Sequence, residues 1–435
     1  MIKRLFFFIS IVALLLTACT DNDSFTTDGS YRLTFSKDTV RLDTLFSTVP
    51  SSTYTFWVYN YSGDGIRIRN VRLERGRQSG FRANVDGTFL NPVATDLEIR
   101  DGDSIRVFVE VTANENMQDT PQLVEDHLLF TLESGVVQRV NLRTYSWDAQ
   151  KLTDLVVSSD QTIDQTKPIV VYGKGIVIEE GATLTIRNTK LFFHDGAGVE
   201  VKGRLVTDNV LMRGDRLDHM FDYLPYDRVS GQWQGVNVVA EAQGVEMTNS
   251  EIRNANTGLR CEATKVELEQ TIIHNCKGHG LYAYDSEVTL SNCLISNTQD
   301  DCLSLHGCQA LVNATTLAQF YPYSANRGAA LRFAKTEKPL LLLCANSVVT
   351  GYDEDVVFGD GRDGETVQFL FENTLLRTPF VDDADAFVDM IWEKPTDEVQ
   401  GTKHFIKVDE TNLIYDFRLK DESPAKERGM GWHGE

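Results

Sequence analysis

Three consecutive stretches of this chain repeat one pattern: Val245–Asn254 (VEMTNSEIRN), Val266–Asn275 (VELEQTIIHN) and Val288–Asn297 (VTLSNCLISN). Matching asparagines are 21 residues apart between Asn254 and Asn275, and 22 apart between Asn275 and Asn297. Each stretch contains short runs in which apolar and polar residues alternate. A fixed step of this size, filled with short alternating runs, is typical of a solenoid in which each repeat forms one coil.

The same unit recurs on both sides of these stretches. Its first residues are Asn188, Asn209, Asn249, Gln270, Asn292, Ala314, Asn346 and Asn373. Most steps are 21 or 22 residues, and the longer steps that begin at 209, 314 and 346 predict inserted loops. The runs are short, β-branched and alternating, which favours strands over helices. The pattern therefore predicts about eight coils between residues 150 and 381.

Several further motifs support a particular kind of solenoid. They are Gly175–Ile186, Asp195–Leu205, Gln232–Val236 and, near the end, Asp416–Leu419. Together they resemble the right-handed parallel β-helix, or pectin-lyase-like, family across residues 155–425. Such a solenoid exposes strand edges at both ends and needs caps. We expect the preceding domain with residues 150–175 to cover one end, and residues 382–435 to form the C-terminal cap and tail.

Residues 31–148 follow a different pattern. Roughly seven short alternating runs, such as Tyr54–Tyr59 and Ser104–Val111, are separated by turn signals such as Asp101-Gly102-Asp103. Strands of this number and length predict an immunoglobulin-like β-sandwich, which makes the whole chain all-β. The run Asp38–Phe46 resembles the N-terminal domain of many Bacteroidetes surface lipoproteins. This implies a stalk or spacer.

The first residues predict an export signal rather than part of a fold. Lys3-Arg4 precede the apolar run Leu5–Leu16, which is too short to span a membrane as a stable helix. Leu16-Thr17-Ala18-Cys19 resembles the bacterial lipobox, which implies a signal peptide over 1–19 and lipidation of Cys19. The acidic segment after Cys19 resembles the signal that directs Bacteroidetes lipoproteins to the cell exterior. We expect a tether over 20–30, an outer-membrane location facing outward, and membrane contact only through the lipid.

Composition narrows the range of partners. The 435 residues carry a formal net charge of −21, which disfavours nucleic acid and anionic lipid. This charge is compatible with neutral or cationic partners, or with partners bridged by bound cations. The six cysteines after Cys19 all lie in the repeat region without a CxxC pair, which gives no support to a zinc site of that kind. Several have apolar positions in the alternation, which predicts buried free thiols.

The second strand of each coil offers the best candidate surface. Expected inward pairs are Val199/Val201, Val236/Val238, Leu259/Cys261, Leu281/Ala283, Leu303/Leu305, Leu331/Phe333 and Val356/Phe358. Their neighbours then form two outward columns: Glu200, Asn237, Arg260, Tyr282, Ser304, Arg332, and Lys202, Val239, Glu262, Tyr284, His306, Ala334. Arg, Tyr and His bind sugars by stacking and charge-assisted hydrogen bonds. The predicted ligand-binding residues are Arg260, Tyr282, Tyr284, His306 and Arg332; the alternative is an ordinary solvated face.

Asn297–Leu303, which contains Asp300-Asp301, resembles the carboxylate coil of family 28 polygalacturonases. Those inverting hydrolases use an acid and a base carboxyl about 6.5–9.5 Å apart. Here Lys277-Gly278-His279-Gly280 replaces the expected aspartate coil, and the expected Arg-x-Lys is missing. If the protein is an enzyme, the candidate catalytic residues are Asp300, Asp301 and His306.

A polysaccharide lyase is a second enzymatic alternative. It would need Arg260 or Arg332 as base, with Ca²⁺ held by Asp353, Asp355, Asp360 and Asp363. Asp-Gly-rich loops are also ordinary turns.

Two other residue sets favour structural roles. Asn254, Asn275 and Asn297 predict a stacked ladder at a turn, a device of β-helices. His274, Cys276 and His279 match no standard metal spacing, so no metal site is predicted. The leading hypothesis is a surface lipoprotein that binds glycan or acts as an adhesin. The alternatives are a lyase or hydrolase of uronate-containing glycans, and a structural envelope protein.

Overall fold

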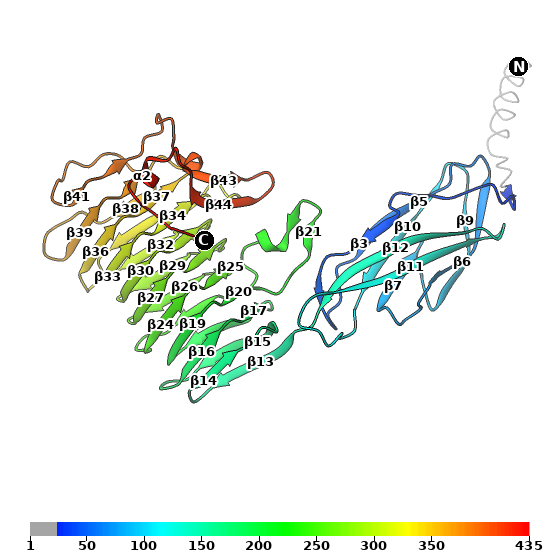
Figure 1. Cartoon of the computed structure of the whole chain (residues 1–435), viewed down its shortest axis with the longest axis horizontal. Coiled ribbons are helices and arrows are strands. Elements are labelled where there is room, and N and C mark those ends of the chain that lie inside the picture. The colour runs from blue at the N-terminus through cyan, green and yellow to red at the C-terminus, as the bar shows by residue number, and fades with distance from the viewer. Residues whose placement is uncertain (1–23, 435) are drawn as a thin grey trace, which may run out of the picture. The chain divides into compact units, whose positions relative to one another are not determined.

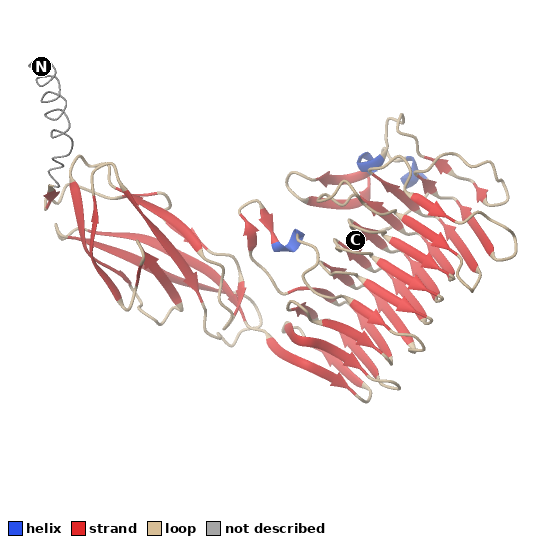
Figure 2. Ribbon diagram, turned by 180° about the vertical axis from the view of Figure 1, so that it is seen from behind, coloured by secondary structure: helices blue, strands red, loops and turns tan. Residues whose placement is uncertain are grey.

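The computed structural model describes residues 24–434, so the expected signal peptide and Cys19 lie outside the described residues. Two compact units divide the chain: residues 24–116 with 121–147, and residues 117–120 with 148–434. Almost all regular structure is β-strand (Figure 2). Within residues 24–434, no helix has the length and apolar character needed to cross a bilayer.

The N-terminal unit contains two sheets that share one core. The seven-stranded sheet holds β1 (Phe25–Thr26), β3 (Thr39–Arg41), β4 (Leu45–Phe46), β6 (Gly65–Leu73), β9 (Val93–Ile99), β11 (Gln122–Leu132) and β12 (Val137–Trp147). The five-stranded sheet holds β2 (Thr34–Phe35), β5 (Tyr54–Tyr59), β7 (Phe81–Val85), β8 (Thr88–Phe89) and β10 (Ser104–Val111). Alternate residues of both sheets, such as Val58, Val107 and Phe130, are fully buried in the same cluster.

The second unit winds three strands into each regular coil (Figure 1). One strand of each coil enters a ten-stranded parallel sheet: β14 (Gln161–Asp164), β16 (Thr183–Arg187), β19 (Arg204–Asp208), β24 (Gly244–Thr248), β27 (Lys265–Glu269), β30 (Glu287–Ser291), β33 (Gln309–Asn313), β36 (Leu340–Ala345), β39 (Val367–Glu372) and β41 (Phe387–Val388).

The other two strands of each coil enter an 18-stranded sheet. Its first row holds β17 (Lys190–Phe193), β20 (Leu211–Gly214), β25 (Glu251–Arg253), β28 (Ile272–His274), β31 (Leu294–Ser296), β34 (Thr316–Gln319), β37 (Val348–Gly351), β40 (Leu375–Leu376) and β42 (Ile391–Trp392). Its second row holds β18 (Gly198–Val201), β23 (Val236–Val238), β26 (Leu259–Glu262), β29 (Leu281–Tyr284), β32 (Leu303–His306), β35 (Leu331–Ala334) and β38 (Val357–Gly359). Two longer strands, β13 (Gln150–Val157) and β15 (Ile169–Ile178), begin this sheet.

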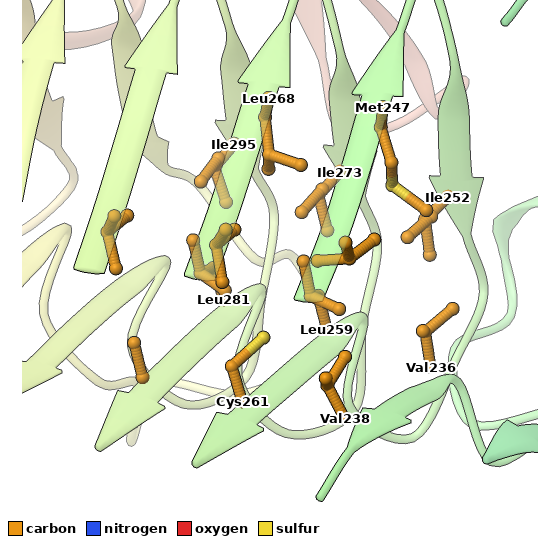
Figure 3. Packing of buried hydrophobic residues seen from close by; sticks show 14 of the residues in the cluster. Val236, Val238, Met247, Ile252, Leu259, Cys261, Leu268, Ile273, Leu281 and Ile295 are labelled. Carbon is orange, nitrogen blue, oxygen red and sulfur yellow. The ribbon is translucent and has the colours of Figure 1, made fainter. Parts of the chain in front are cut away.

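The interior of the solenoid is a stack of aliphatic layers. Val236, Leu259 and Leu281 lie above one another in successive coils, and so do Ile252, Ile273 and Ile295 (Figure 3). All six cysteines of this unit are free and buried, as the sequence predicted. Burial raises the pKa of the Cys276 and Cys302 thiols to about 12 each, so they behave as small apolar groups.

All eight unit starts identified in the sequence have left-handed backbone. Their φ values run from 42° at Asn373 to 55° at Asn209. Asparagine tolerates this region better than most residues because its short side chain hydrogen-bonds locally. The amides also join successive coils: Asn209 Nδ2 donates to Asn188 Oδ1 at 3.0 Å, and Asn373 Nδ2 to Asn346 Oδ1 at 2.8 Å.

Ala314 is the strained member of this series, because alanine has φ 47° there without a side-chain hydrogen bond to compensate. We expect Ala314→Gly to stabilise the second unit by about 0.5–1 kcal/mol, measured by urea unfolding. The control is Ala310→Gly in β33, a strand position where glycine should destabilise by about as much. A change in stability of the same sign in both variants would contradict the strain assigned to Ala314.

The C-terminal residues do not act only as the expected end cap. Strands β41 and β42 continue the two sheets to Trp392, beyond the expected boundary at 381. The following segment contains η2 (Gly401–His404), β43 (Phe405–Asp409), β44 (Ile414–Leu419) and α2 (Pro424–Glu427). It packs along the first row of strands, where Phe405 and Phe417 join Leu294 and Val348 in a separate apolar cluster (Figure 1). In this part of the first row the outward residues, such as Leu294 and Val348, are apolar, and the segment removes them from water.

Candidate functional site

The second row of strands carries the outward columns predicted from the repeat. Strand pairing in register forms the first column from Asn237, Arg260, Tyr282, Ser304, Arg332 and Phe358. The second column contains Glu262, Tyr284, His306 and Ala334. The backbones of neighbouring residues in a column are about 4.8 Å apart, because adjacent strands have that spacing. All five predicted ligand-binding residues therefore lie on one face.

Phe358 departs from the expected alternation. It was expected inside, but its side chain is 45% exposed. Strand β38 pairs so that Phe358 lies opposite Arg332 and Gly359 opposite Phe333, one residue from the expected register. A shift by one residue exchanges the inner and outer faces of a strand. Phe358 therefore joins the first column, with the Arg332 Cζ atom 5.4 Å from its ring centroid.

Ser304 also differs from the expectation, because it points outward in register but is fully buried. Its hydroxyl Oγ lies 3.2 Å from Asp301 Oδ2 and 3.1 Å from His306 Nε2. Ser304 therefore does not contact solvent. It links a carboxylate to an imidazole beneath the surface of the face.

Asp301 is a buried carboxylate with a full set of partners, and only 4% of the residue is exposed. Its Oδ1 accepts a hydrogen bond from the Ala329 backbone N–H at 2.7 Å. Its Oδ2 accepts one from Arg332 Nε at 2.8 Å. Truncating a carboxylate in such a setting leaves the buried donors unpaired. Asp301 therefore fixes Arg332 and Ser304 in place rather than reaching a ligand itself.

His306 lies at the edge of this network and is half-buried. Burial lowers the pKa of the imidazole below its usual value, and the neighbouring His279 and Arg332 act in the same direction. The carboxylates of Asp301 and Asp360 oppose this shift. The net lowering favours a neutral imidazole near neutral pH.

His279 brings a second imidazole to the same place. Its Nδ1 lies 3.7 Å from Asp301 Oδ2, and its Nε2 lies 4.0 Å from Asp300 Oδ2. Among the described residues, His279 Nδ1 has no hydrogen-bond partner although it is buried. Asp300, in contrast, has a side chain that is 57% exposed. The two aspartates thus have different environments, and only Asp300 is open to solvent.

Tyr282 lies between the two histidines. Its ring centroid is 5.1 Å from that of His279 and 5.3 Å from that of His306. From the preceding coil, the Arg260 Cζ atom lies 5.6 Å from the Tyr282 ring centroid. Tyr282 is half-buried and Arg260 is exposed. The result is a continuous aromatic and cationic surface across three coils.

A hollow of about 350 Å³ continues the face on the N-terminal side of Arg260. Its polar lining comes from Lys174, Glu200, Gln234, Asn237, Asn256, Thr257 and Arg260. Amide, hydroxyl and cationic groups of this kind supply both donors and acceptors to a polar ligand. The hollow therefore extends the candidate surface beyond the predicted residues.

Gln234 and Thr257, which line this hollow, are not among the residues predicted from the sequence. Both directly precede the glycine that stands just before the second-row strand, Gly235 and Gly258 respectively. His279 precedes Gly280 in the same way, and the backbone hydrogen bonds Gly258 N to His279 O and Gly280 N to Asp301 O confirm the stacking. Aligning the residue before this glycine in each coil, in addition to the strand residues, would have identified Gln234, Thr257 and His279 as equivalent positions.

The predicted insertions contact one another and the coils that carry the face. Ser230 Oγ and Tyr321 Oη are 2.8 Å apart, and Tyr323 Oη donates to the Arg228 carbonyl at 2.9 Å. Gly328 packs so closely that an added Cβ would lie 2.4 Å from Asp301 N. The 320–328 insertion therefore covers Asp301.

The 215–232 insertion is fastened by one carboxylate. Asp227 Oδ1 accepts from Arg213 Nη1 at 2.6 Å and from Arg253 Nη1 at 3.0 Å. Burial alone would raise the pKa of Asp227, but the two guanidinium groups outweigh it and hold that pKa below its usual range. Arg213, the first residue of an Arg-Gly-Asp tripeptide, is only 8% exposed, so this tripeptide is not displayed as a loop.

Asn254, Asn275 and Asn297 form part of the turn. All three are buried and have positive φ, from 52° to 62°. Their backbone N–H groups donate to His274, Ser296 and Ala318 in the next coil. Their burial at the turn places them outside the candidate surface. The stacked side-chain ladder stays a prediction, because among the described residues Asn254 Oδ1, Asn275 Nδ2 and Asn297 Oδ1 have no hydrogen-bond partner.

His274, which is close in sequence to Cys276 and His279, lies in the core under the C-terminal segment. Its Nδ1 lies 2.9 Å from Ser296 Oγ, and Tyr415 and Phe417 pack on its ring. Burial, with Arg228 and Arg253 nearby, lowers the pKa of His274 from 6.5 to about 3. The imidazole is therefore neutral in the folded protein over most of the accessible pH range.

This shift predicts an acid sensitivity of folding. Between about pH 6 and 3 the unfolded chain binds a proton at His274 that the folded protein does not bind, so stability falls as pH falls. We expect a loss of about 1 kcal/mol for each pH unit below about 6. The measurement is urea unfolding as a function of pH, with His274→Gln as the comparison. The variant should show a shallower slope; an unchanged slope would contradict the assignment.

The residues present do not fit the calcium site considered for a lyase. Within residues 24–434, no group of three or more His, Cys, Asp or Glu side chains is arranged to hold a metal ion. Asp363 instead accepts hydrogen bonds from the backbone N–H groups of Glu365, Thr366 and Val367. Asp355 accepts from Thr378 Oγ1 at 2.8 Å. These carboxylates stabilise turns, which is the ordinary role of Asp-Gly segments.

Comparison with solved structures gives distant similarities. The catalytic unit of the GH87 α-1,3-glucanase from Streptomyces thermodiastaticus strain HF3-3 is 10% identical, with 78% of this chain and 89% of that chain covered, at a TM-score of 0.24. The Vibrio cholerae VesB protease is 14% identical over 28% of this chain and 33% of that chain, with a TM-score of 0.19. The Clostridium perfringens family 123 glycoside hydrolase is 8% identical over 28% of this chain and 26% of that chain, with a TM-score of 0.20. The chain thus spans about a third of the protease and a quarter of the hydrolase.

A comparison with curated proteins finds no match. A family model does match: residues 155–317 fit the model described as the right-handed β-helix region. The matched range contains β14 to β33 and includes Arg260, Tyr282, Tyr284 and His306. The second unit of this protein thus contains a right-handed parallel β-helix, which supports the predicted pectin-lyase-like fold.

Proposed function

We propose that this protein is a cell-surface lipoprotein whose β-helix binds glycan through the second row of strands. The observation that carries the proposal is the Tyr282 ring between two histidines, with Arg260 of the preceding coil 5.6 Å from its centroid. A half-buried ring offers a stacking platform for a sugar, and guanidinium groups donate to hydroxyl or carboxylate oxygens. Tyr284, His306 and Arg332 complete the contact surface.

In this proposal the N-terminal unit and Cys19 hold the β-helix at the cell surface. The N-terminal unit serves as an immunoglobulin-like spacer, supported by two sheets around one core. Acyl chains on Cys19 hold the protein to the outer membrane with the β-helix directed outward, supported by the lipobox and the acidic residues that follow it. Calcium and nucleic acid have no part in this function.

The test is a glycan array probed with the full chain in detergent. We expect retention on a defined set of glycans, and loss of most of that signal in Arg260→Ala and Tyr282→Ala. Attachment of cells that display the same variants should fall in parallel. A silent array, with cell attachment unchanged by both substitutions, would leave a structural envelope role and overturn glycan binding.

A further inference from the structure

The outer face of the five-stranded sheet in the N-terminal unit is aromatic, whereas a sheet face in water is normally polar. Trp57 and Tyr59 have outward positions in β5, Phe108 has one in β10 and Phe89 one in β8 (Figure 1). Tyr61, just after β5, stacks on Tyr59 with ring centroids 5.4 Å apart and an interplanar angle of 12°. Trp57 is 41%, Phe89 55% and Tyr61 65% exposed. We call these five residues the aromatic platform.

Strand pairing places the rings of the platform next to one another. Arg106 of β10 lies opposite Trp57 of β5, and Phe108 is two residues further along β10 on the same face. Phe108, Asn84 of β7 and Phe89 lie opposite one another in adjacent strands. Adjacent strands are about 4.8 Å apart and alternate residues of one strand about 6.8 Å apart, so the backbone positions of neighbouring rings lie roughly 7–10 Å from one another. The rings therefore form one continuous surface.

Arg106 brings a positive charge into the middle of the platform. Its Cζ atom lies 4.8 Å from the Phe108 ring centroid and 5.6 Å from that of Trp57, so the guanidinium is held between two aromatic rings. Arg106 is exposed, and within residues 24–434 no carboxylate lies within ion-pair distance of it. Its charge and its N–H donors are therefore available to a ligand.

The outer face of the seven-stranded sheet in the same unit shows the ordinary arrangement. Arg67 Nε lies 2.8 Å from a Glu98 carboxylate oxygen, and its Nη1 lies 3.3 Å from Glu133. Arg143 Nε lies 2.6 Å from Glu125. Each of these guanidinium groups has its counter-charge within the protein. The five-stranded sheet differs, because its central guanidinium has no such partner.

A cavity of about 340 Å³ adjoins the platform and includes Phe89 in its lining. The rest of its apolar lining comes from Leu73, Phe81, Leu90 and Pro92, and its guanidinium groups come from Arg77 and Arg82. Arg82 pairs with Glu110 at 3.4 Å. Arg77 donates to the amide oxygen of Asn91 and, among the described residues, pairs with no carboxylate. The cavity thus offers a recess for a substituent and a second unpaired positive charge.

We propose that the five-stranded sheet is a second glycan-binding surface, and that its ligand is an acidic glycan with carboxylate or sulfate groups. The rings of the platform offer stacking surface to the apolar faces of sugars. Arg106 has no counter-charge in the protein, so an anionic group of the ligand supplies it through paired hydrogen bonds. The surface lies in a different unit from the second row of strands, and its binding does not depend on binding there.

The net charge of −21 does not prevent this binding. At physiological ionic strength, interactions between exposed charges are largely screened beyond about 8 Å. The unpaired guanidinium groups of Arg106 and Arg77 therefore dominate the field close to the platform. On the glycan array, this surface accounts for the acidic-glycan signal that remains after Arg260→Ala and Tyr282→Ala.

The experiment measures binding of the full chain, in detergent, to chondroitin sulfate, polygalacturonate and dextran coupled to agarose. Every protein carries Arg260→Ala and Tyr282→Ala, which remove the surface proposed on the second row of strands. We expect retention on at least one of the two acidic polymers and none on the neutral dextran. Polygalacturonate carries only carboxylates, so comparison with chondroitin sulfate shows which anionic group is recognised. Retention should weaken as salt is raised.

In this background, Trp57→Ala and Arg106→Gln should each weaken binding to the retained polymer by about tenfold. Tyr145→Ala is the control for the ring, since Tyr145 is 48% exposed on the seven-stranded sheet. Arg67→Gln is the control for the charge, since Arg67 Cζ also lies over a ring, that of Phe25, at 4.5 Å, but Arg67 is ion-paired. Both controls should bind like the background protein.

Three results would each overturn the proposal: no retention on either acidic polymer, equal retention on dextran, or unchanged binding in Arg106→Gln. Arg106→Gln removes no ring and no ion pair, so it tests the surface even if Trp57→Ala weakens the fold. Failure of the second-row surface is seen separately, because every protein in this experiment already lacks Arg260 and Tyr282. A silent second row therefore leaves these outcomes unchanged.

Discussion

Glu393→Gln is expected to lower the free energy of unfolding of the β-helix unit by about 3–5 kcal/mol. Glu393 is 3% exposed and contacts two buried side chains, a guanidinium and an imidazole. One is Arg377, whose Nη1 donates to Glu393 Oε1; the other is His404, whose Nε2 lies 3.2 Å from Oε2. Neutralising Glu393 leaves the Arg377 guanidinium in the interior without its counter-charge. Breaking one partner of a buried ion pair is far more costly than losing a surface pair.

The carboxylate also fastens the C-terminal segment to the coils. Thr350 Oγ1 in β37 and the Gly401 backbone N–H in η2 both donate to it, at 2.8 and 2.6 Å. Burial alone would raise the pKa of Glu393, but the hydrogen bond and charge of His404, with Thr350 and Gly401, hold it below its usual range. Because the folded-state pKa is lowered, this stability is present at neutral pH and is lost on acidification.

The measurement is urea unfolding at neutral pH, followed by tryptophan fluorescence. Glu398→Gln is the control, since residue 398 is exposed and only five positions away. We expect the control to change stability by less than about 0.5 kcal/mol. Similar stabilities for the two variants would show that the C-terminal segment is not held by this carboxylate.

Trp233→Ala is expected to cost about 3–5 kcal/mol, because it removes the largest fully buried side chain of the solenoid. The indole stacks on Phe193 at a centroid distance of 4.2 Å and an interplanar angle of 10°. Its Nε1 donates to the Arg253 carbonyl at 2.8 Å. Substitution leaves a cavity beneath the 215–232 insertion and an acceptor without its partner.

The same variant should disturb the hollow, because Gln234 follows Trp233 directly and lines it. Thermal unfolding measures the stability, and the matched control is Tyr223→Ala. Tyr223 belongs to the same insertion but is 76% exposed. A small effect of Trp233→Ala, close to that of the control, would contradict the packing described for this coil.

The repeat was predictable because it depends on local rules. Left-handed backbone at Asn188 and its equivalents follows from the turn that each coil requires, and alternation then sets which side chains face outward. The same logic failed at β38. The acidic bend Asp353–Asp355 precedes this strand, and it has no counterpart in the preceding coils from which to fix the register. Phe358 was therefore placed on the wrong face.

The network at the site depends on contacts that are distant in sequence. Asp301 is buried because Ala329 and Gly328, on an insertion of irregular length, close over it. Ser304 is buried for a related reason, since Arg332 from the next coil reaches back to Asp301. Likewise, Phe405 and Phe417 carry no repeat signal that would assign them to the side of the solenoid rather than its end.

The central claim is that the second row of strands binds glycan, and calorimetric titration tests it most directly. The ligand is the glycan best retained on the array, and the protein is the full chain in detergent. We predict that Tyr282→Ala and Arg332→Ala each weaken binding by about tenfold, or about 1.4 kcal/mol. Leu311→Ala, on the outer side of the ten-stranded sheet where Leu311 is 41% exposed, should bind like the unmodified protein. Unchanged affinity in both face variants, or an equal loss in Leu311→Ala, would contradict the claim.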